Sequence, residues 1–115
     1  MLCILLVLQL VAGQTYHRET IDSIDKSSAV RVEVEGIVQA VTLRQDKVLT
    51  FRIADEHGHS LGCIWPGSGR NQPRVGVKIK VLGVRHRFQI LRTFGAGTET
   101  AYITEIDPVE AIDVD

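Results

Sequence analysis

The chain has 115 residues, the size of one ordinary domain, and 44% of them are hydrophobic, so a folded core can form. Its 13 Lys and Arg residues oppose 14 Asp and Glu residues, which gives a formal net charge of −1. This balance excludes an overall electrostatic attraction to nucleic acid or to acidic lipid.

An apolar run occupies residues 2–13, LCILLVLQLVAG. It is shorter than the roughly 20 residues that span a bilayer, and its length is typical of the hydrophobic region of a signal peptide. We therefore expect residues 1–13 to be a signal peptide or an N-terminal anchor, and the protein to be exported: periplasmic, extracellular or membrane-associated. A buried first strand is the alternative interpretation. The polar residues 14–29 are expected to be a leader or linker, in which Ile21 and Ile24 allow one helical turn.

Three strands are predicted between residues 30 and 65. Polar and apolar residues alternate from Val30, as in a strand with one buried face, and Gly36 marks a bulge or bend within it. A bent strand of this kind can serve both halves of a small closed barrel. Alternation returns at residues 49–54, where Phe51 is expected to be buried, and residues 61–65 follow a turn closely enough to complete a hairpin.

The second half of the chain adds two predicted strands. Two prolines and three glycines in residues 66–76 predict a loop, and residues 77–84 alternate as a fourth strand. Residues 85–100 are expected to be a long connection whose end is flexible, and residues 101–106 the fifth strand, followed by an acidic tail at 108–115. Five short strands without a secure helix predict an all-β fold, a small five-stranded Greek-key barrel over residues 30–107.

Three stretches resemble a known family: VEVEGIVQAV, LTFRIADEHGHSLGCIW and RVGVKIKVLGVRHRF. They are similar to the core of OB-fold nucleic-acid-binding domains, and also to the OB modules of exported or membrane-bound sensor proteins. The resemblance implies an OB-type barrel whose ligand face lies on the second and third strands and their flanking loops. Many members carry a helix between the third and fourth strands, and here a loop replaces it.

Basic residues gather in the middle of the chain, because residues 57–98 hold seven Lys and Arg and no Asp or Glu. Arginine and lysine beside aromatic side chains are typical of proteins that bind single-stranded nucleic acid. One hypothesis is therefore an exported OB-type module that binds single-stranded nucleic acid or another polyanion. The alternative is a cell-envelope module that binds a protein or small ligand, with its basic residues paired to its own acidic tail. The candidate ligand-binding residues are Arg52, Trp65, Lys78, Lys80, Arg85 and Arg87.

Other chemistry is not favoured by the sequence. Residues 58–62, GHSLG, match the letters of a serine-nucleophile motif, but that motif needs a strand before the serine and a helix after it, whereas Ser60 enters a predicted strand. His57 and His59 lie on a turn, and no second pair of ligands stands at a spacing suited to zinc. We therefore expect no enzyme activity, no metal and no cofactor.

Phe88 and Ile90 are expected to plug one end of the barrel.

Overall fold

The computed structural model describes residues 15–66 and 72–114, so the signal peptide or anchor predicted at residues 1–13 lies outside the described residues. Within these two ranges, no helix is long and apolar enough to cross a membrane. The fold is all-β, as predicted. Its elements are β1 (His17–Glu19), a short 3-10 helix η1 (Ile24–Lys26), β2 (Arg31–Leu43), β3 (Leu49–Ala54), β4 (Ser60–Trp65), β5 (Lys78–Phe94) and β6 (Gly97–Val114).

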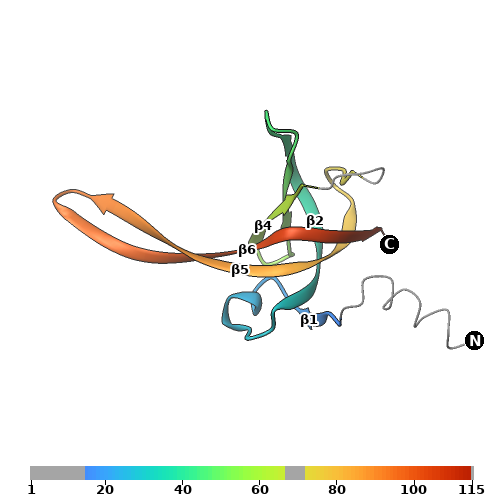
Figure 1. Cartoon of the computed structure of the whole chain (residues 1–115), viewed down its shortest axis with the longest axis horizontal. Coiled ribbons are helices and arrows are strands. Elements are labelled where there is room, and N and C mark those ends of the chain that lie inside the picture. Colours follow the sequence, from blue (N-terminus) through green and yellow to red (C-terminus); the bar gives the residue numbers. More distant parts are fainter. Residues whose placement is uncertain (1–14, 67–71, 115) are drawn as a thin grey trace, which may run out of the picture.

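Five of the strands close into a ring (Figure 1). Strands β2, β3 and β4 are consecutive antiparallel neighbours, and β5 returns to pair antiparallel with β2, which is the Greek-key order. Strand β6 completes the ring, because it pairs antiparallel with β5 and parallel with β4 at Gly62 and Cys63. The predicted Greek-key barrel is thus confirmed as a barrel-like ring.

Strand β2 shows how a single strand serves both halves of the ring. Its first half, residues 31–37, pairs with β5, and its second half, residues 37–43, pairs with β3. The register shifts between Val38 and Ala40, close to the predicted bend at Gly36. A Cβ atom at Gly36 would lie 3.0 Å from both Ile21 and Ile53, so the glycine lets the core approach the strand closely.

The core lies inside the ring and follows the predicted alternation. Alternate residues of β2 and β3 are buried, and Phe51 is only 4% exposed, as expected. Val30 differs from the prediction: it precedes β2 and is exposed. The turn between β3 and β4 also forms as predicted, because the Asp55 carboxylate accepts hydrogen bonds from the backbone N–H groups of His57 and His59, and Gly58 has a positive φ of 87°.

The expected flexible connection at residues 85–100 is wrong. Strand β5 runs on to Phe94, and β6 begins at Gly97, so these residues form a long two-stranded arm that leaves the ring (Figure 1, orange). The two strands are in continuous register from Arg85 opposite Ile106 to Phe94 opposite Gly97. Phe88 and Ile90 lie on this arm and do not plug the ring. The composition of this stretch suggested flexibility, but its cross-strand partner supplies the missing backbone hydrogen bonds.

The acidic tail predicted at residues 108–115 is also wrong, because β6 continues to Val114. Pro108 lies within this strand, although proline donates no hydrogen bond to a sheet. In the structure it lies where the register shifts, because Gly83 is opposite Val109 whereas Arg85 is opposite Ile106. A proline is tolerated at such an irregularity.

Residues 15–29 belong to the folded unit, whereas a leader or linker was expected. Strand β1 pairs in parallel with the start of β2, and η1 supplies the helical turn that Ile21 and Ile24 suggested. Both isoleucines are buried in the core of the ring, at 6% and 2% exposed. Both side chains pack with the buried residues of the strands.

Candidate functional site

The six residues predicted to bind a ligand do not form one site. Arg52 lies on the outer surface of β3, Lys78 and Lys80 on β5, and the remaining basic residues at the base of the arm. Trp65, expected to be a stacking platform, is 8% exposed and belongs to the core. It is opposite Leu49 in the register of β3 and β4, and Leu49 is also buried, so the pair points into the ring. Trp65 is therefore not available to stack on a base.

Arg85 and Arg87 are used to hold the N-terminal segment. The Arg85 guanidinium donates hydrogen bonds to the carbonyl oxygens of Ile24 and Asp25, each at 2.7 Å. The Arg87 Nε atom lies 3.4 Å from Asp25 Oδ1, and its guanidinium stacks 4.4 Å from the centre of the Tyr102 ring. Both side chains therefore have intramolecular partners in place of phosphates.

Asp25 completes this contact with Thr104. The Thr104 hydroxyl donates a 2.6 Å hydrogen bond to Asp25 Oδ1. This hydrogen bond, followed by the nearby Arg87 charge, lowers the pKa of the Asp25 carboxyl below its ordinary value. The partners of the basic residues thus come from the N-terminal segment and β2, whereas the sequence suggested the C-terminal acidic residues. Of those acidic residues, Glu110 forms a 3.0 Å ion pair with Arg31, and Asp107 lies 4.0 Å from His86.

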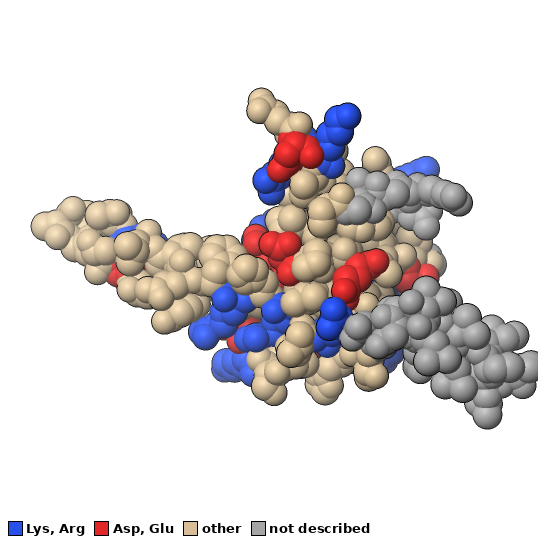
Figure 2. Space-filling view, viewed as in Figure 1, with Lys and Arg blue, Asp and Glu red and all other residues tan. Residues whose placement is uncertain are grey.

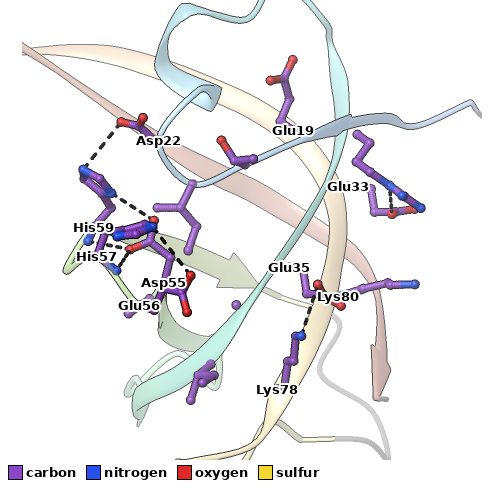
Figure 3. A pocket seen from close by; sticks show the side chains of 16 residues that line it. Glu19, Asp22, Glu33, Glu35, Asp55, Glu56, His57, His59, Lys78 and Lys80 are labelled. Atoms are coloured by element: carbon purple, nitrogen blue, oxygen red, sulfur yellow. Dashed lines mark hydrogen bonds and ion pairs between the residues drawn. The ribbon is translucent and has the colours of Figure 1, made fainter.

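Lys78 and Lys80 share one face of β5, as predicted, but that face borders a mainly acidic groove of about 730 Å³ (Figure 3). Lys78 Nζ lies 3.6 Å from Glu35 Oε1, and Arg18 at the groove's edge pairs with Glu33 at 3.1 Å. Besides these two glutamates, the groove is lined by four more carboxylates and by two histidines: Glu19, Asp22, Asp55, Glu56, His57 and His59. A polyanion would be repelled here.

One of the two histidines of this groove, His59, is held by carboxylates. His59 Nδ1 lies 3.0 Å from Asp55 Oδ2, and its Nε2 atom lies 3.6 Å from Asp22 Oδ1, as the dashed lines in Figure 3 show. These contacts join the β3–β4 turn to the N-terminal segment. Within residues 15–66 and 72–114, no group of three or more His, Cys, Asp or Glu side chains is arranged to hold a metal ion.

A second, smaller hollow of about 350 Å³ lies on the outer surface of β3 and β4. Thr50, Arg52 and Ile64 line it, as expected of the outward residues of these strands, together with Thr42 of β2 and Glu105 of β6. A Cβ atom at Gly62 would lie 2.9 Å from a Glu105 carboxylate oxygen and 3.3 Å from Arg52 Nη1, so both charged groups extend over this glycine. The hollow thus has balanced charge and a largely uncharged lining.

The arm extends this surface with an apolar face. Residues opposite each other in an antiparallel pair point to the same side of the sheet. Glu105 of the hollow therefore shares a face with every second residue of the arm along β6, and with the residues of β5 that lie opposite these. The His86 and Phe88 rings pack edge to face at 5.5 Å, and Phe94 at the tip is 60% exposed. We call this surface the apolar face of the arm; its apolar residues are Phe88, Ile90, Phe94, Ala101 and Ile103, and one charged cross-strand pair, Arg92 and Glu99, lies on the same face.

Charged side chains are concentrated away from the outer arm. Figure 2 shows Lys and Arg side chains gathered beneath the base of the arm. The outer half of the arm shows few Lys, Arg, Asp or Glu side chains. Between residues 89 and 104 the sequence has only two charged residues, Arg92 and Glu99, and these are cross-strand partners. This surface is not among the sequence predictions. The alternation of Arg87, Phe88, Gln89 and Ile90 was the signal that could have shown a strand there.

Two residues with nucleophilic side chains, Ser60 and Cys63, lack the surroundings of a catalytic nucleophile. Ser60 begins strand β4 and accepts a 3.0 Å hydrogen bond from Arg52 Nε, so it does not occupy the strand-to-helix turn of a nucleophilic serine. Cys63 is 1% exposed, and its burial raises the pKa of the thiol well above its ordinary range, which disfavours the reactive thiolate.

No protein-family model matches the chain, and no curated protein is found to be similar to it. Function is therefore inferred from the surfaces of the molecule alone. Two of them distinguish the competing hypotheses: the basic residues, which are dispersed and largely engaged within the molecule, and the apolar face of the arm, which is continuous with the hollow on β3 and β4.

Proposed function

We propose that this chain is a non-catalytic binding module with an OB-type ring, which binds a protein partner through the apolar face of its arm and the adjoining hollow. The module is proposed to be exported, because residues 1–13 are typical of a signal peptide or an N-terminal anchor. Support for an OB-type ring comes from the Greek-key order of β2 to β5 and from the closing strand β6. In an OB domain the ligand face lies on the second and third strands, which here are β3 and β4.

The exposed apolar side chains of the arm carry this proposal. On the apolar face, Phe94 and Ile103 are 60% and 36% exposed, whereas Leu91 and Tyr102, 68% and 53% exposed, lie on the opposite face of the arm. Clustered apolar residues on the surface of a protein mark sites where another protein binds, because their burial is favourable. A flexible connection at these residues would not hold apolar side chains on one surface. The paired strands of the arm place Phe94 and Ile103 on one face.

The polyanion alternative has weaker support. Of its six candidate residues, Trp65 is buried, Arg85 and Arg87 hold the N-terminal segment, and Lys78 is paired with Glu35. Only Arg52 lies on the face where an OB domain would bind its ligand, and there it is accompanied by Glu105. Phosphates would meet little unbalanced positive charge on this face.

The proposal is tested by recovering partners of the tagged full chain from the cells that make it. A variant with both Phe88→Ser and Ile103→Ser removes two cross-strand neighbours of the apolar face. Its control carries Leu43→Ser and Val75→Ser, which are 61% and 64% exposed on other parts of the molecule. We expect wild type and control to recover the same protein, and the apolar-face variant to lose it at least about tenfold, which corresponds to 1.4 kcal/mol.

Nuclease treatment separates the two hypotheses in the same experiment. Recovery of the partner is expected to survive nuclease treatment, because the contact is between proteins. Recovery that depends on nucleic acid, or that is equally weakened by the apolar-face variant and its control, would contradict the proposal.

A further inference from the structure

The arm has open edges as well as an apolar face. Pairing of β5 with β2 ends where Val84 is opposite Arg31, and β6 pairs with β4 only through Glu105 and Ile106. Beyond these points the two strands of the arm pair only with each other among the described residues. Their outer edges therefore present backbone N–H and C=O groups to solvent, as edge strands do.

The sequence of the outer arm does little to protect these edges. Proteins usually guard an exposed edge with lysine, proline or a bulge. Residues 89–104 contain no Lys or Pro, and their register shows no shift. A ribbon of two strands is also marginally stable in water, whereas three or more strands support one another. The arm is thus built to accept an additional strand.

Charge distinguishes the two edges. The β5 edge carries Arg85, Arg87 and Arg92, so two copies of this edge would repel each other. Residues 97–104 of β6 carry a single charge, Glu99. If two copies of this segment align antiparallel about Ala101, Glu99 lies beside Ile103 of the second copy and no like charges are opposed. The net charge of −1 on the whole chain adds little repulsion between copies.

We propose that two copies of this chain pair through the outer edges of residues 97–104 in β6, so that their arms form one four-stranded antiparallel sheet. The pairing is twofold symmetric, as in most homodimers. A twofold axis perpendicular to the sheet leaves the apolar faces of both arms on the same side. This inference goes beyond the proposed function, because it concerns the edge of the arm and leaves the apolar face free for a different protein.

Sedimentation velocity of the purified full chain measures the assembly directly. Thr98→Lys with Thr100→Lys places two positive charges on the β6 edge of each copy. The matched control, Gln89→Lys with Thr93→Lys, places the same charges on the β5 edge. All four positions are exposed, and Thr93 and Thr98 are cross-strand partners, so both variants disturb the arm to a similar degree.

We expect a dimer for wild type and for the β5 control, and at least a tenfold larger dissociation constant, about 1.4 kcal/mol, for the β6 variant. A monomeric wild type, or equal effects of the two variants, would overturn the proposal. The two variants would also have equal effects if residues outside the arm mediated the association.

Disulfide trapping provides a second measurement that does not depend on weakening the dimer. In a Cys3→Ser background, Ala101→Cys places a thiol at the proposed centre of the pairing, and Ile90→Cys places it on the cross-strand partner. Mild oxidation should link two copies through position 101 and leave the position 90 variant unlinked. The reverse pattern, or no linkage at either position, would contradict the pairing. Failure here leaves the proposed function intact if the chain still recovers its protein partner.

Discussion

Phe51→Ala is expected to lower the free energy of unfolding by about 3–5 kcal/mol, the usual cost of truncating a buried aromatic side chain. Phe51 is 4% exposed, and its neighbours across β2 and β4 are Val41 and Cys63. Removing the ring leaves a cavity in the middle of the barrel-like ring, where surrounding strands cannot easily collapse. Chemical denaturation with urea, followed by circular dichroism, measures the change.

Phe94→Ala is the matched control for this substitution. Phe94 is 60% exposed at the tip of the arm, so the same chemical change should alter stability by no more than about 0.5 kcal/mol. Similar denaturation midpoints for Phe51→Ala and wild type would show that Phe51 lies outside the core.

Gly83→Ala is the second substitution with a large expected effect. A Cβ atom at this position would lie 2.5 Å from both Ile106 Cγ2 and the Pro108 carbonyl oxygen, and 3.0 Å from Val109 Cα. Two of these atoms belong to the backbone of β6, so the strand itself would have to move. We expect a loss of about 1–3 kcal/mol or more, as for other overpacked cores. The urea midpoint of the purified variant again provides the measurement.

Gly97→Ala tests whether the close approach at Gly83 causes the loss. A Cβ atom at Gly97 would meet its nearest neighbour, the Phe94 carbonyl oxygen, at an ordinary 3.6 Å. The change in stability should stay within about 0.5 kcal/mol. Equal losses at Gly83 and Gly97 would indicate a general cost of replacing glycine in these strands, and would argue against the close approach of β6 to Gly83 as the cause.

The ring was predictable because its residues alternate strictly. Phe51 and Ile53 on β3, and Ile79 and Val81 on β5, each follow the period of two that a half-buried strand requires. The turn at Asp55 was predictable for a local reason, since the Asp55 carboxylate and Gly58 suit one tight turn. These features depend on neighbours in sequence, which a single chain reveals.

The arm and the candidate site were not predictable in the same way. Residues 97–106 lie alongside the part of β5 that follows Val84. The alternation at residues 87–90 indicates a strand, but neither segment alone shows which strand it pairs with. Whether an arginine is free to bind a ligand likewise depends on distant partners. Arg85 donates hydrogen bonds to Ile24 and Asp25, which are 60 or more positions away in the sequence. Counting charges along the chain could therefore indicate basic residues but not which of them remain free to bind a ligand.

A crosslinking scan along β5 tests the central claim, that the apolar face of the arm binds a protein, most directly. A photoreactive amino acid is placed in turn at positions 87 to 94 of the full chain, and crosslinked products are identified in the cells that make it. Because successive residues of a strand point to opposite faces, we predict protein crosslinks from Phe88, Ile90, Arg92 and Phe94 and few from Arg87, Gln89, Leu91 and Thr93. Crosslinks without this period of two, or crosslinks to nucleic acid from these positions, would contradict the claim.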